Sequence, residues 1–462
     1  MKKDYTLAII LFATLAIRLL FAFGWHEIWW DSGVYIGMGK YIYSGGQLGL
    51  FEHIRPPIMP LILGAAWKLG LDPALFGRLI EIILMLGIVA LTYKLSEKWW
   101  DKKTAAIASL IVAFSPIFYY LSFHQYTEIP STFAILLALW LFTKQKHFWA
   151  GLAIGIAFLT KFYTGIFIAI LLIALATSKK WKQAAITTTG FIAITAPYFA
   201  WSWIAYGSPL ATILAAQEAI SRALGCNVLR YKPWWQYFHW LVFSETKLYL
   251  MAIPGVIALW KKPKKLYLLS LIIPAIYLMQ LHCRDYRYLT ILIPFTAMLT
   301  GLGIVWVYDR LKIKKKQIFA LLIILLSAWM MITCIKYYYG NELQQPDITA
   351  EEYFNYPTED IKGEIWTSNP IIAAHSNSKL EKMYYPIYDK GVSTDFKEYL
   401  QTNHEKIGAV FLDNCGGGII CPPEEKECLK QTEQIIQELD KHFKRTLDKQ
   451  TGNCWYRIWT TS

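Results

Sequence analysis

The chain has 462 residues, of which 55% are hydrophobic, 16% aromatic and only 17% charged. A typical soluble chain carries about 25% charged residues and has no long uncharged apolar runs. Apolar runs recur here from Thr6 to Ile335, so the composition predicts a polytopic membrane protein. It excludes a cytosolic enzyme, a fibrous protein and a disordered chain. The net charge of +13 gathers mostly in short clusters between these runs, which indicates membrane topology rather than nucleic-acid binding.

Eleven apolar stretches are candidate transmembrane helices, because a bilayer core about 30 Å thick needs roughly 20 apolar residues per helix. They are 5–24, 76–96, 104–121, 128–143, 148–160, 163–177, 184–204, 248–260, 266–281, 289–307 and 317–335. The stretch 148–177 is split in two because a single helix would bury Lys161 in mid-membrane. The expected fold class is therefore mainly α, a polytopic helix bundle.

Every second connection between these spans is basic. The clusters are Lys2–Lys3; Lys98, Lys102 and Lys103; Lys144 and Lys146; Lys179, Lys180 and Lys182; Lys261, Lys262, Lys264 and Lys265; and Arg310 through Lys316. The positive-inside rule places all six in the cytoplasm. We therefore expect the N-terminus to be cytoplasmic and the C-terminus to lie outside, with two long outward loops at 25–75 and 205–247.

The chain changes character after the last span, and two domains are expected, at 1–335 and 336–462. Charge rises in the second, where IGAVFLD (407–413) and CWYRIW (454–459) read as strands and 429–447 reads as an amphipathic helix. This pattern predicts a small extracytoplasmic α/β domain. Its four cysteines, at positions 415, 421, 428 and 454, lack the paired spacing of zinc ligands. Two disulfides are the better reading, with three pairings possible.

The first outward loop holds candidate catalytic residues. Asp31 follows Trp30 just after the first span, and Tyr35, His53 and Arg55 come later in the same loop. Aromatic faces stack on sugars, an arginine binds phosphate, and a carboxylate can accept a hydroxyl proton. The loop therefore fits a sugar attached to a lipid phosphate. An interfacial aromatic anchor beside a solvated acid is the alternative.

Tyr126 and Glu128 form a second candidate group at the outer start of the 128–143 span. An acid followed by Pro130 is typical of a helix N-terminus. Glu128 could also act as a second catalytic acid, and Asp31 and Glu128 together could hold a divalent metal. Deeper in the spans, Arg18 and Glu81 are expected to pair with each other.

Outward cations form a third group. Lys161 lies between two short spans, while Arg284 and Arg287 precede Tyr288 in HCRDYRYL. Such residues can reach lipid headgroups with their charged ends. However, outward connections are normally poor in Lys and Arg, and an anionic lipid phosphate would explain why these cations are present.

Five motifs in this order resemble a known family of membrane enzymes. They are WWDSGVY, RPPIMPLIL, TEIPSTF, GLAIGIAFLTKFYTG and RYLTILIPF. Over about residues 1–310 the chain resembles the polytopic glycosyltransferases of the GT-C superfold. It is most similar to the family 39-like protein mannosyltransferases and the lipid A aminoarabinose transferase group. The segment WTSNPIIAAHS followed by YYP resembles the tails of archaeal members.

The resemblance implies a donor made of one sugar on a polyprenyl or dolichyl phosphate, used outside the cytoplasm with inversion at the anomeric carbon. Asp31 matches the acid at the reacting centre. Many members have two adjacent acids there, and this chain has Asp31–Ser32, which puts a metal at this loop alone in doubt. Arg55, Lys161, Arg284 and Arg287 match basic positions near the lipid phosphate.

Two other functions are alternatives. An oligosaccharyltransferase-like enzyme would use a lipid diphosphate donor and would need paired acids, a metal and a larger soluble domain. A transporter or flippase would show inverted halves and ionisable residues at mid-membrane, whereas here the polar residues gather at the outer face. The sequence does not identify the sugar, the length of the lipid or the acceptor, which could be a protein, a glycan or a lipid.

Overall fold

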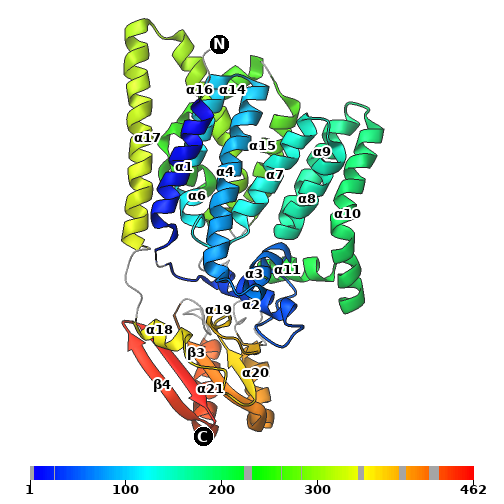
Figure 1. The fold of residues 1–462 in the computed structure, drawn as a ribbon, viewed down its shortest axis with the longest axis vertical. Coiled ribbons are helices and arrows are strands. Elements are labelled where there is room, and N and C mark those ends of the chain that lie inside the picture. The colour runs from blue at the N-terminus through cyan, green and yellow to red at the C-terminus, as the bar shows by residue number, and fades with distance from the viewer. Residues whose placement is uncertain are drawn as a thin grey trace. The chain divides into compact units, whose positions relative to one another are not determined.

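The computed structural model describes residues 5–24, 26–222, 232–261, 263–281, 284–341, 348–383, 392–415 and 426–461. The chain divides into two compact units (Figure 1). Unit 1 consists of Met1–Gly24, Arg78–Ala211 and Lys232–Leu343. Unit 2 consists of Trp25–Gly77, Thr212–Tyr231 and Gln344–Ser462. The second unit thus combines the first predicted outward loop with the C-terminal region.

Unit 1 is helical. Its α-helices are α1 (Thr6–Ala22), α4 (Pro73–Trp99, of which the first turn belongs to unit 2), α5 (Lys102–Ala113), α6 (Pro116–Leu121), α7 (Glu128–Thr143), α8 (His147–Thr160), α9 (Ile166–Ala176), α10 (Trp181–Tyr206), α13 (Gln236–His239), α14 (Ala252–Lys261), α15 (Lys265–Gln280), α16 (Ile293–Arg310) and α17 (Ile313–Asn341). Shorter turns are η1 (Phe162–Gly165), the π-helix η2 (Trp240–Glu245), η3 (Lys247–Met251) and η4 (Tyr286–Ile291).

These helices follow the predicted spans closely. One predicted span, 104–121, is broken into α5 and α6, because Ser115 is extended and Pro116 begins a new helix. Among the described residues, two helices are long and apolar enough to cross a membrane, α4 and the segment Lys315–Thr333 of α17. Other apolar helices of unit 1, such as α1, α7, α8 and α15, have only 10–17 residues, so the number of spans stays a prediction.

Helices α8 and α10 approach each other closely, and glycines make this possible. A Cβ atom at Gly151 would lie 1.9 Å from the carbonyl oxygen of Thr187, and one at Gly190 would lie 2.0 Å from that of Phe148. Small residues allow membrane helices to pack backbone to backbone. Because α8 ends where Lys161 turns to an extended conformation, this packing also fixes the position of Lys161.

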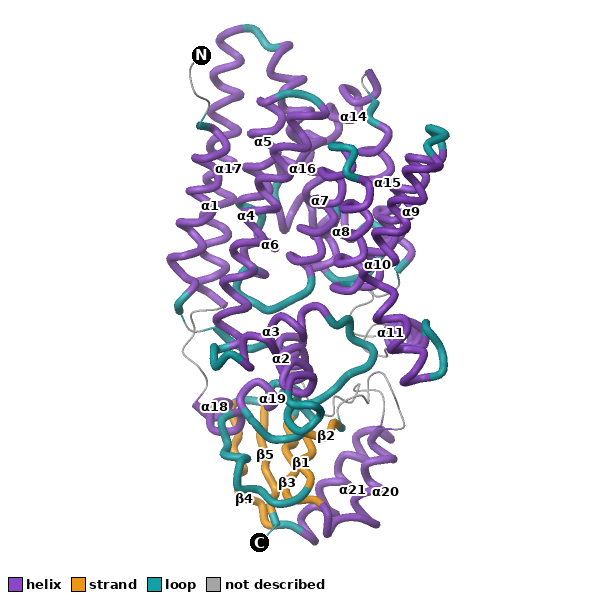
Figure 2. Tube along the Cα trace, turned by 45° about the vertical axis from the view of Figure 1, so that its right-hand side comes forward, coloured by secondary structure: helices purple, strands orange, loops and turns teal. Residues whose placement is uncertain are grey.

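Unit 2 is an α/β domain (Figure 2). Its helices are α2 (Trp30–Tyr43), α3 (Ile58–Lys68), most of α11 (Ala211–Arg222), α18 (Ile348–Phe354), α19 (Ile372–His375), α20 (Val392–Asn403), η5 (His404–Lys406) and α21 (Lys426–His442). Its strands are β1 (Glu364–Thr367), β2 (Leu380–Lys382), β3 (Ile407–Asp413), β4 (Lys444–Thr451) and β5 (Cys454–Thr460).

The five strands form one sheet in the order β2-β1-β3-β5-β4. β1 lies parallel to β2 and β3, whereas β5 is antiparallel to both β3 and β4. The strands expected at 407–413 and 454–459 are confirmed by β3 and β5. The helix expected at 429–447 was wrong at its end: α21 ends at His442, because the residues that follow pair with β5 as β4.

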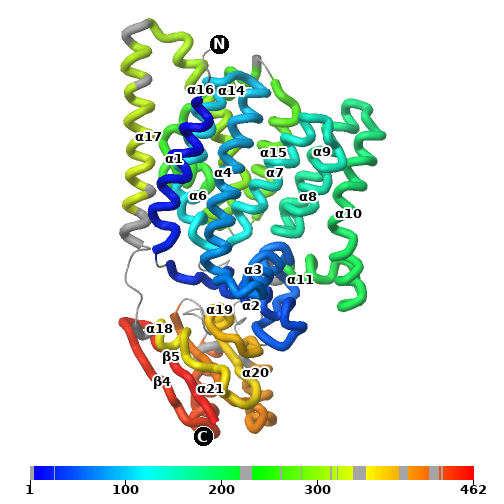
Figure 3. The backbone as a smooth tube through the Cα atoms, in the orientation of Figure 1, coloured from blue at the N-terminus to red at the C-terminus, as the bar shows by residue number. Residues whose placement is uncertain are grey.

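Helices cover both faces of this sheet. On one face, Val410 and Leu412 of β3 share a core with α20 and α21, which contribute Leu400 and Leu439. On the other face, Phe411 shares a core with α2, α18 and α19. The stretch 25–75 is therefore not a plain loop as expected, since it holds α2 and α3. Figure 3 shows α2, in blue, beside α19, although the two are more than 300 residues apart in the sequence.

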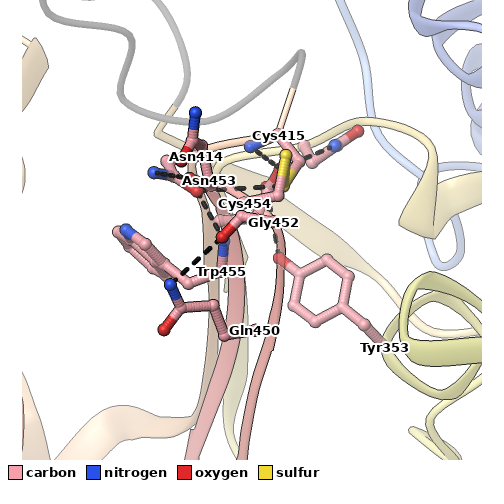
Figure 4. The surroundings of a disulfide bond; sticks show 10 residues. Tyr353, Asn414, Cys415, Gln450, Gly452, Asn453, Cys454 and Trp455 are labelled. Atoms are coloured by element: carbon pink, nitrogen blue, oxygen red, sulfur yellow. Dashed lines mark hydrogen bonds between the residues drawn. A yellow bond between two sulfur atoms is a disulfide. The ribbon is translucent and has the colours of Figure 1, made fainter.

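A disulfide joins Cys415, just after β3, to Cys454 at the start of β5 (Figure 4). Asn414 supports the same corner, because its Oδ1 accepts a hydrogen bond from the backbone N–H of Trp455 at 2.7 Å. This bond is one of the three pairings that the sequence left open for Cys415. A second bond between Cys421 and Cys428 falls outside the residues and side chains that the structure describes.

Candidate functional site

Asp31 lies in the first turn of α2, where the positive end of the helix dipole stabilises a carboxylate. Its Oδ1 is 2.9 Å from Nη1 of Arg55. The Nε of Arg55 donates to Oε2 of Glu52 at 3.0 Å. Glu52 is fully buried, while Asp31 and Arg55 are each about one-fifth exposed. One guanidinium therefore holds two carboxylates in a row, and the more exposed one is Asp31.

Three further residues surround this row. The ring of Tyr35 lies 5.8 Å from the guanidinium of Arg55. Lys382, from β2, interacts electrostatically with Glu52, Arg55 and His53. Burial, assisted by the charge of Lys382 and opposed by Glu52, lowers the pKa of His53, so this imidazole is neutral at pH 7. We call Asp31, Glu52, His53, Arg55 and Lys382 the Asp31 cluster.

Trp30, a predicted sugar contact, lies at the start of α2. Its side chain is half-buried and packs against the core around Val34 and Tyr353. This packing anchors α2 to the sheet and so helps to position Asp31. Contact between Trp30 and a sugar stays a prediction.

Glu128 is the first residue of α7 and is almost fully buried in unit 1. Nζ of Lys161 donates to its Oε1, and the backbone N–H of Thr127 donates to its Oε2 at 3.1 Å. Nζ of Lys161 also lies 5.4 Å from the ring centroids of both Tyr163 and Tyr288, a favourable place for a cation. The predicted acid and the predicted phosphate cation are thus ion-paired.

The two predicted arginines have different surroundings. Arg287 lies with its guanidinium 4.8 Å from the ring centroid of Tyr126 and pairs with Asp285 at 3.3 Å. Arg284 donates to the backbone carbonyl oxygens of Met279 and Lys232, and therefore braces two segments of unit 1. We call Tyr126, Glu128, Lys161, Arg287 and Tyr288 the Glu128 cluster. Phosphate binding by any of these cations stays a prediction.

The expected pair between Arg18 and Glu81 is not formed. Arg18 donates to Oγ of Ser122 at 2.9 Å and to the carbonyl oxygen of Ala113 at 3.1 Å. Glu81 is fully buried, and neither of its oxygens has a hydrogen-bond partner among the described residues. Glu128 lies close enough to act on its charge. Glu81 therefore belongs beside the Glu128 cluster rather than with Arg18.

Sequence reasoning missed three charged residues that the structure places at buried positions or beside the clusters. Glu52 and Lys382 lie in the Asp31 cluster. Glu245 accepts hydrogen bonds from Ser115, the backbone of Ile117 and the hydroxyl of Tyr286. An acid next to apolar residues was a signal for Glu52 and Glu245. Nothing in the sequence marked Lys382, because its place depends on the pairing of β2.

Within the described residues, no group of three His, Cys, Asp or Glu side chains is placed to hold a metal ion. Asp31 pairs with Arg55, and Glu128 pairs with Lys161, each inside its own unit. These side chains fit charge neutralisation by protein cations better than metal coordination. The divalent metal expected from Asp31 and Glu128 stays a prediction.

Comparisons with known proteins concern the family and the fold of the chain. Residues 54–203 match the family model described as dolichyl-phosphate-mannose-protein mannosyltransferase. This segment contains Arg55, Glu128 and Lys161. No curated protein matches the chain.

Several solved structures share the fold along nearly the whole chain. ArnT from Cupriavidus metallidurans bound to undecaprenyl phosphate has a TM-score of 0.68 at 11% identity, with 99% of this chain and 98% of that chain covered. The archaeal oligosaccharyltransferase AglB from Archaeoglobus fulgidus, in complex with an inhibitory peptide and a dolichol-phosphate, has a TM-score of 0.65 at 14% identity, with 98% and 73% covered. The chain therefore shares the overall fold of these glycosyltransferase structures, and its residues 54–203 resemble the dolichyl-phosphate-mannose-protein mannosyltransferase family.

Proposed function

We propose that this protein is a membrane glycosyltransferase that moves one sugar from a polyprenyl or dolichyl phosphate to an acceptor hydroxyl on the outer face of the membrane. The ion pair between Asp31 and Arg55 is the observation that carries the proposal, because it joins a carboxylate base to a phosphate-binding side chain. Support for a lipid phosphate donor comes from the match over residues 54–203 and from the lipid phosphates named in the similar structures.

The reaction is a single displacement at the anomeric carbon. The acceptor oxygen forms a bond to that carbon while its proton passes to the carboxylate of Asp31. The bond between the anomeric carbon and the phosphate oxygen breaks, and its electron pair leaves with the lipid phosphate. The transition state is oxocarbenium-like, and one in-line step inverts the anomeric configuration. A positioned general base contributes typically 10²–10⁴-fold to the rate.

Cations stabilise the charge that develops on the departing phosphate. Arg55 is a candidate because it pairs with the proposed base and lies beside the ring of Tyr35. Lys161 and Arg287 are candidates in the Glu128 cluster, where each is partly exposed beside an aromatic ring. Such preorganised charges act strongly where water is excluded. Arg284 contributes less directly, since its guanidinium is engaged with backbone carbonyl groups.

Aromatic side chains contact the sugar or the acceptor in this proposal. Tyr35 lies in the Asp31 cluster, and Tyr126 and Tyr288 lie in the Glu128 cluster. The neutral imidazole of His53 can donate one hydrogen bond to a hydroxyl and accept another. Glu128 is the second acid in this proposal and orients the acceptor. Lys161 holds the carboxylate of Glu128.

A donor-consumption assay tests the function. The purified protein in lipid nanodiscs is given dolichyl-phosphate [¹⁴C]mannose or [¹⁴C]glucose, with a Ser/Thr-rich peptide, a glycan or a phospholipid as acceptor. We expect consumption of at least one lipid-phosphate sugar and release of dolichyl phosphate. A parallel reaction with a lipid-diphosphate oligosaccharide tests the oligosaccharyltransferase alternative. Consumption of the diphosphate donor alone would reject single-sugar transfer.

A further inference from the structure

We infer that Lys382, supplied by the C-terminal part of the chain, is a positioning residue of the Asp31 site. It shares the charge of buried Glu52 with Arg55, so that Arg55 is left to hold Asp31. The inference rests on the proposed function, because it assigns Lys382 a role in the same reaction.

Backbone pairing first brings Lys382 to the cluster. The N–H of Gly49 donates to the carbonyl oxygen of Ser378 at 2.9 Å, and the N–H of Leu380 donates to that of Gly49 at 2.9 Å. Gly49 and Lys379 form a parallel bridge. This bridge brings the stretch that leads from Gly49 to Glu52 close to β2, which ends at Lys382. Lys382 lies close enough to Glu52 for their charges to interact.

A second set of contacts holds α2 against the same part of the chain. Nζ of Lys40 donates to the carbonyl oxygens of Ala374 and Ser376 at 3.0 and 2.8 Å. A Cβ atom at Gly33 would lie 2.8 Å from Cα of Ile371, so only glycine permits this approach. Asp31 begins the helix that these contacts hold. Both ends of the row from Lys382 to Asp31 are therefore attached to one domain.

The charges of the cluster require a second cation. Asp31 and Glu52 are two carboxylates, and both pair with the single guanidinium of Arg55. Glu52 is fully buried, and a buried carboxylate that loses its partner is strongly destabilising. Lys382 interacts favourably with Glu52 and unfavourably with Arg55. It therefore balances the buried acid and relieves Arg55 of part of that task.

The other charged groups near Lys382 do not replace it. Glu381 pairs with Lys379 at 2.9 Å. His53 is kept neutral, because burial and Lys382 lower its pKa. Without Lys382, Glu52 would compete fully with Asp31 for Arg55. Asp31 would then be held less firmly by Arg55, and one positive charge fewer would lie near its carboxylate.

Two variants test the role of Lys382. Lys382→Met removes the charge at similar length, and Lys382→Arg keeps it. Lys441→Met is the matched control, because Lys441 is an exposed lysine of α21. We measure kcat and KM against pH with the dolichyl-phosphate sugar that the wild-type protein consumes.

For Lys382→Met we expect kcat to fall about tenfold with KM changed less than threefold, which is the signature of lost positioning rather than lost donor binding. The acidic limb of the kcat/KM profile should move to higher pH by about one unit. Lys382→Arg should restore most of kcat and the position of that limb. Lys382→Met with the kinetics and pH profile of Lys441→Met would overturn the inference while leaving the proposed function intact.

A measurement without turnover separates the two claims. Hydrogen exchange of the peptide that covers residues 49–55 reports whether Lys382 holds this segment. We expect at least tenfold faster exchange in Lys382→Met than in Lys441→Met. If the wild-type protein consumes no donor, the proposed function fails, and unchanged exchange would then overturn the placement of Lys382 as well.

Discussion

Oδ1 of Asp31 lies 2.9 Å from Nη1 of Arg55, although the sequence predicts different partners for the two residues, an acceptor hydroxyl and a donor phosphate. The pair links these two tasks. A phosphate that binds Arg55 would weaken its hold on Asp31 and make this carboxylate more basic when the donor is present. Arg55 therefore keeps the base oriented before the donor arrives.

We predict that Asp31→Asn lowers transfer by at least about 10²-fold, because it removes the proton acceptor while keeping the shape of the side chain. Donor binding should fall much less, since Arg55 remains. The rate and the dissociation constant of the donor check this prediction. Asp360→Asn is the control, because Asp360 is an exposed acid of the same unit.

An Asp31→Asn protein that is folded and transfers at the wild-type rate would make Asp31 only an interfacial acid. Treatment with a chelator, followed by added Mg²⁺ or Mn²⁺, tests the metal prediction on the wild-type protein. Loss of activity that either metal restores would show that the acids act through a metal. Glu128→Gln should also impair transfer, whether or not a metal takes part.

The ion pair between Lys161 and Glu128 changes the expectation for Lys161. From the sequence, Lys161→Ala should weaken donor use more than stability. In the structure, Lys161→Met leaves the buried Glu128 without its cation, and breaking a buried pair costs about 3–5 kcal/mol. We therefore predict a clear loss of thermal stability as well as a higher donor KM. Adding Glu128→Gln should recover much of the lost stability.

Lys146→Met is the control for this pair, because Lys146 is an exposed lysine at the start of α8. The unfolding midpoints of the wild-type protein, Lys161→Met, Glu128→Gln and the double variant form a double-mutant cycle. If Lys161→Met were as stable as the control and only its donor KM changed, Lys161 would serve the phosphate rather than Glu128.

Much of the fold was predictable because long apolar runs and buried strands leave clear periodic patterns. The span 128–143 and the strand 407–413 coincide with α7 and β3. The helices α2 and α3 were missed, since α2 is rich in glycine and tyrosine and neither helix is long enough to span a bilayer. The burial of α2 against the sheet depends on residues more than 300 positions away, and α3 packs on α2, which local patterns do not report.

The site was predictable only in part. Asp31, Arg55, Glu128 and Lys161 stood out because charged residues are rare beside apolar spans. The pairing of Asp31 with Arg55 and of Glu128 with Lys161 could not be predicted. A pair across 24 or 33 positions depends on how helices and turns pack. Arg284 carried the same sequence signal as its neighbours, yet the structure uses it to bind backbone carbonyl groups.

Membrane orientation is the third prediction. The basic connections should be cytoplasmic and the α/β unit should lie outside. Cysteines introduced at Lys103 and Lys441, both about two-thirds exposed, are treated in intact cells with a membrane-impermeant maleimide. We expect labelling at position 441, and at position 103 only after the cells are opened. The reverse pattern would overturn the orientation and the outer-face site.

The last prediction concerns Asp413, at the carboxyl end of β3. It lies next to the end of β1, at the point where the parallel strand order reverses. Its carboxylate accepts hydrogen bonds from Ser368, Asn369 and the backbone N–H of Cys415. Burial nevertheless raises the pKa of Asp413 to about 6, from a usual value of 3.8.

A raised pKa means that the folded state binds the proton more tightly than the unfolded state. The contribution of Asp413 to stability is therefore fully present below about pH 4, and it is lost as the pH rises through about 6, by up to about 3 kcal/mol. Burial lowers the pKa of His375 to about 4, which gives the opposite slope. Comparison with Asp413→Asn removes the His375 contribution, because both proteins contain it.

Hydrogen exchange of the 407–413 peptide at pH 4.5 and 7, corrected for the intrinsic rate, gives the opening free energy of β3. We expect it to fall with pH in the wild-type protein relative to the variant, and parallel pH dependences would show that Asp413 ionises normally.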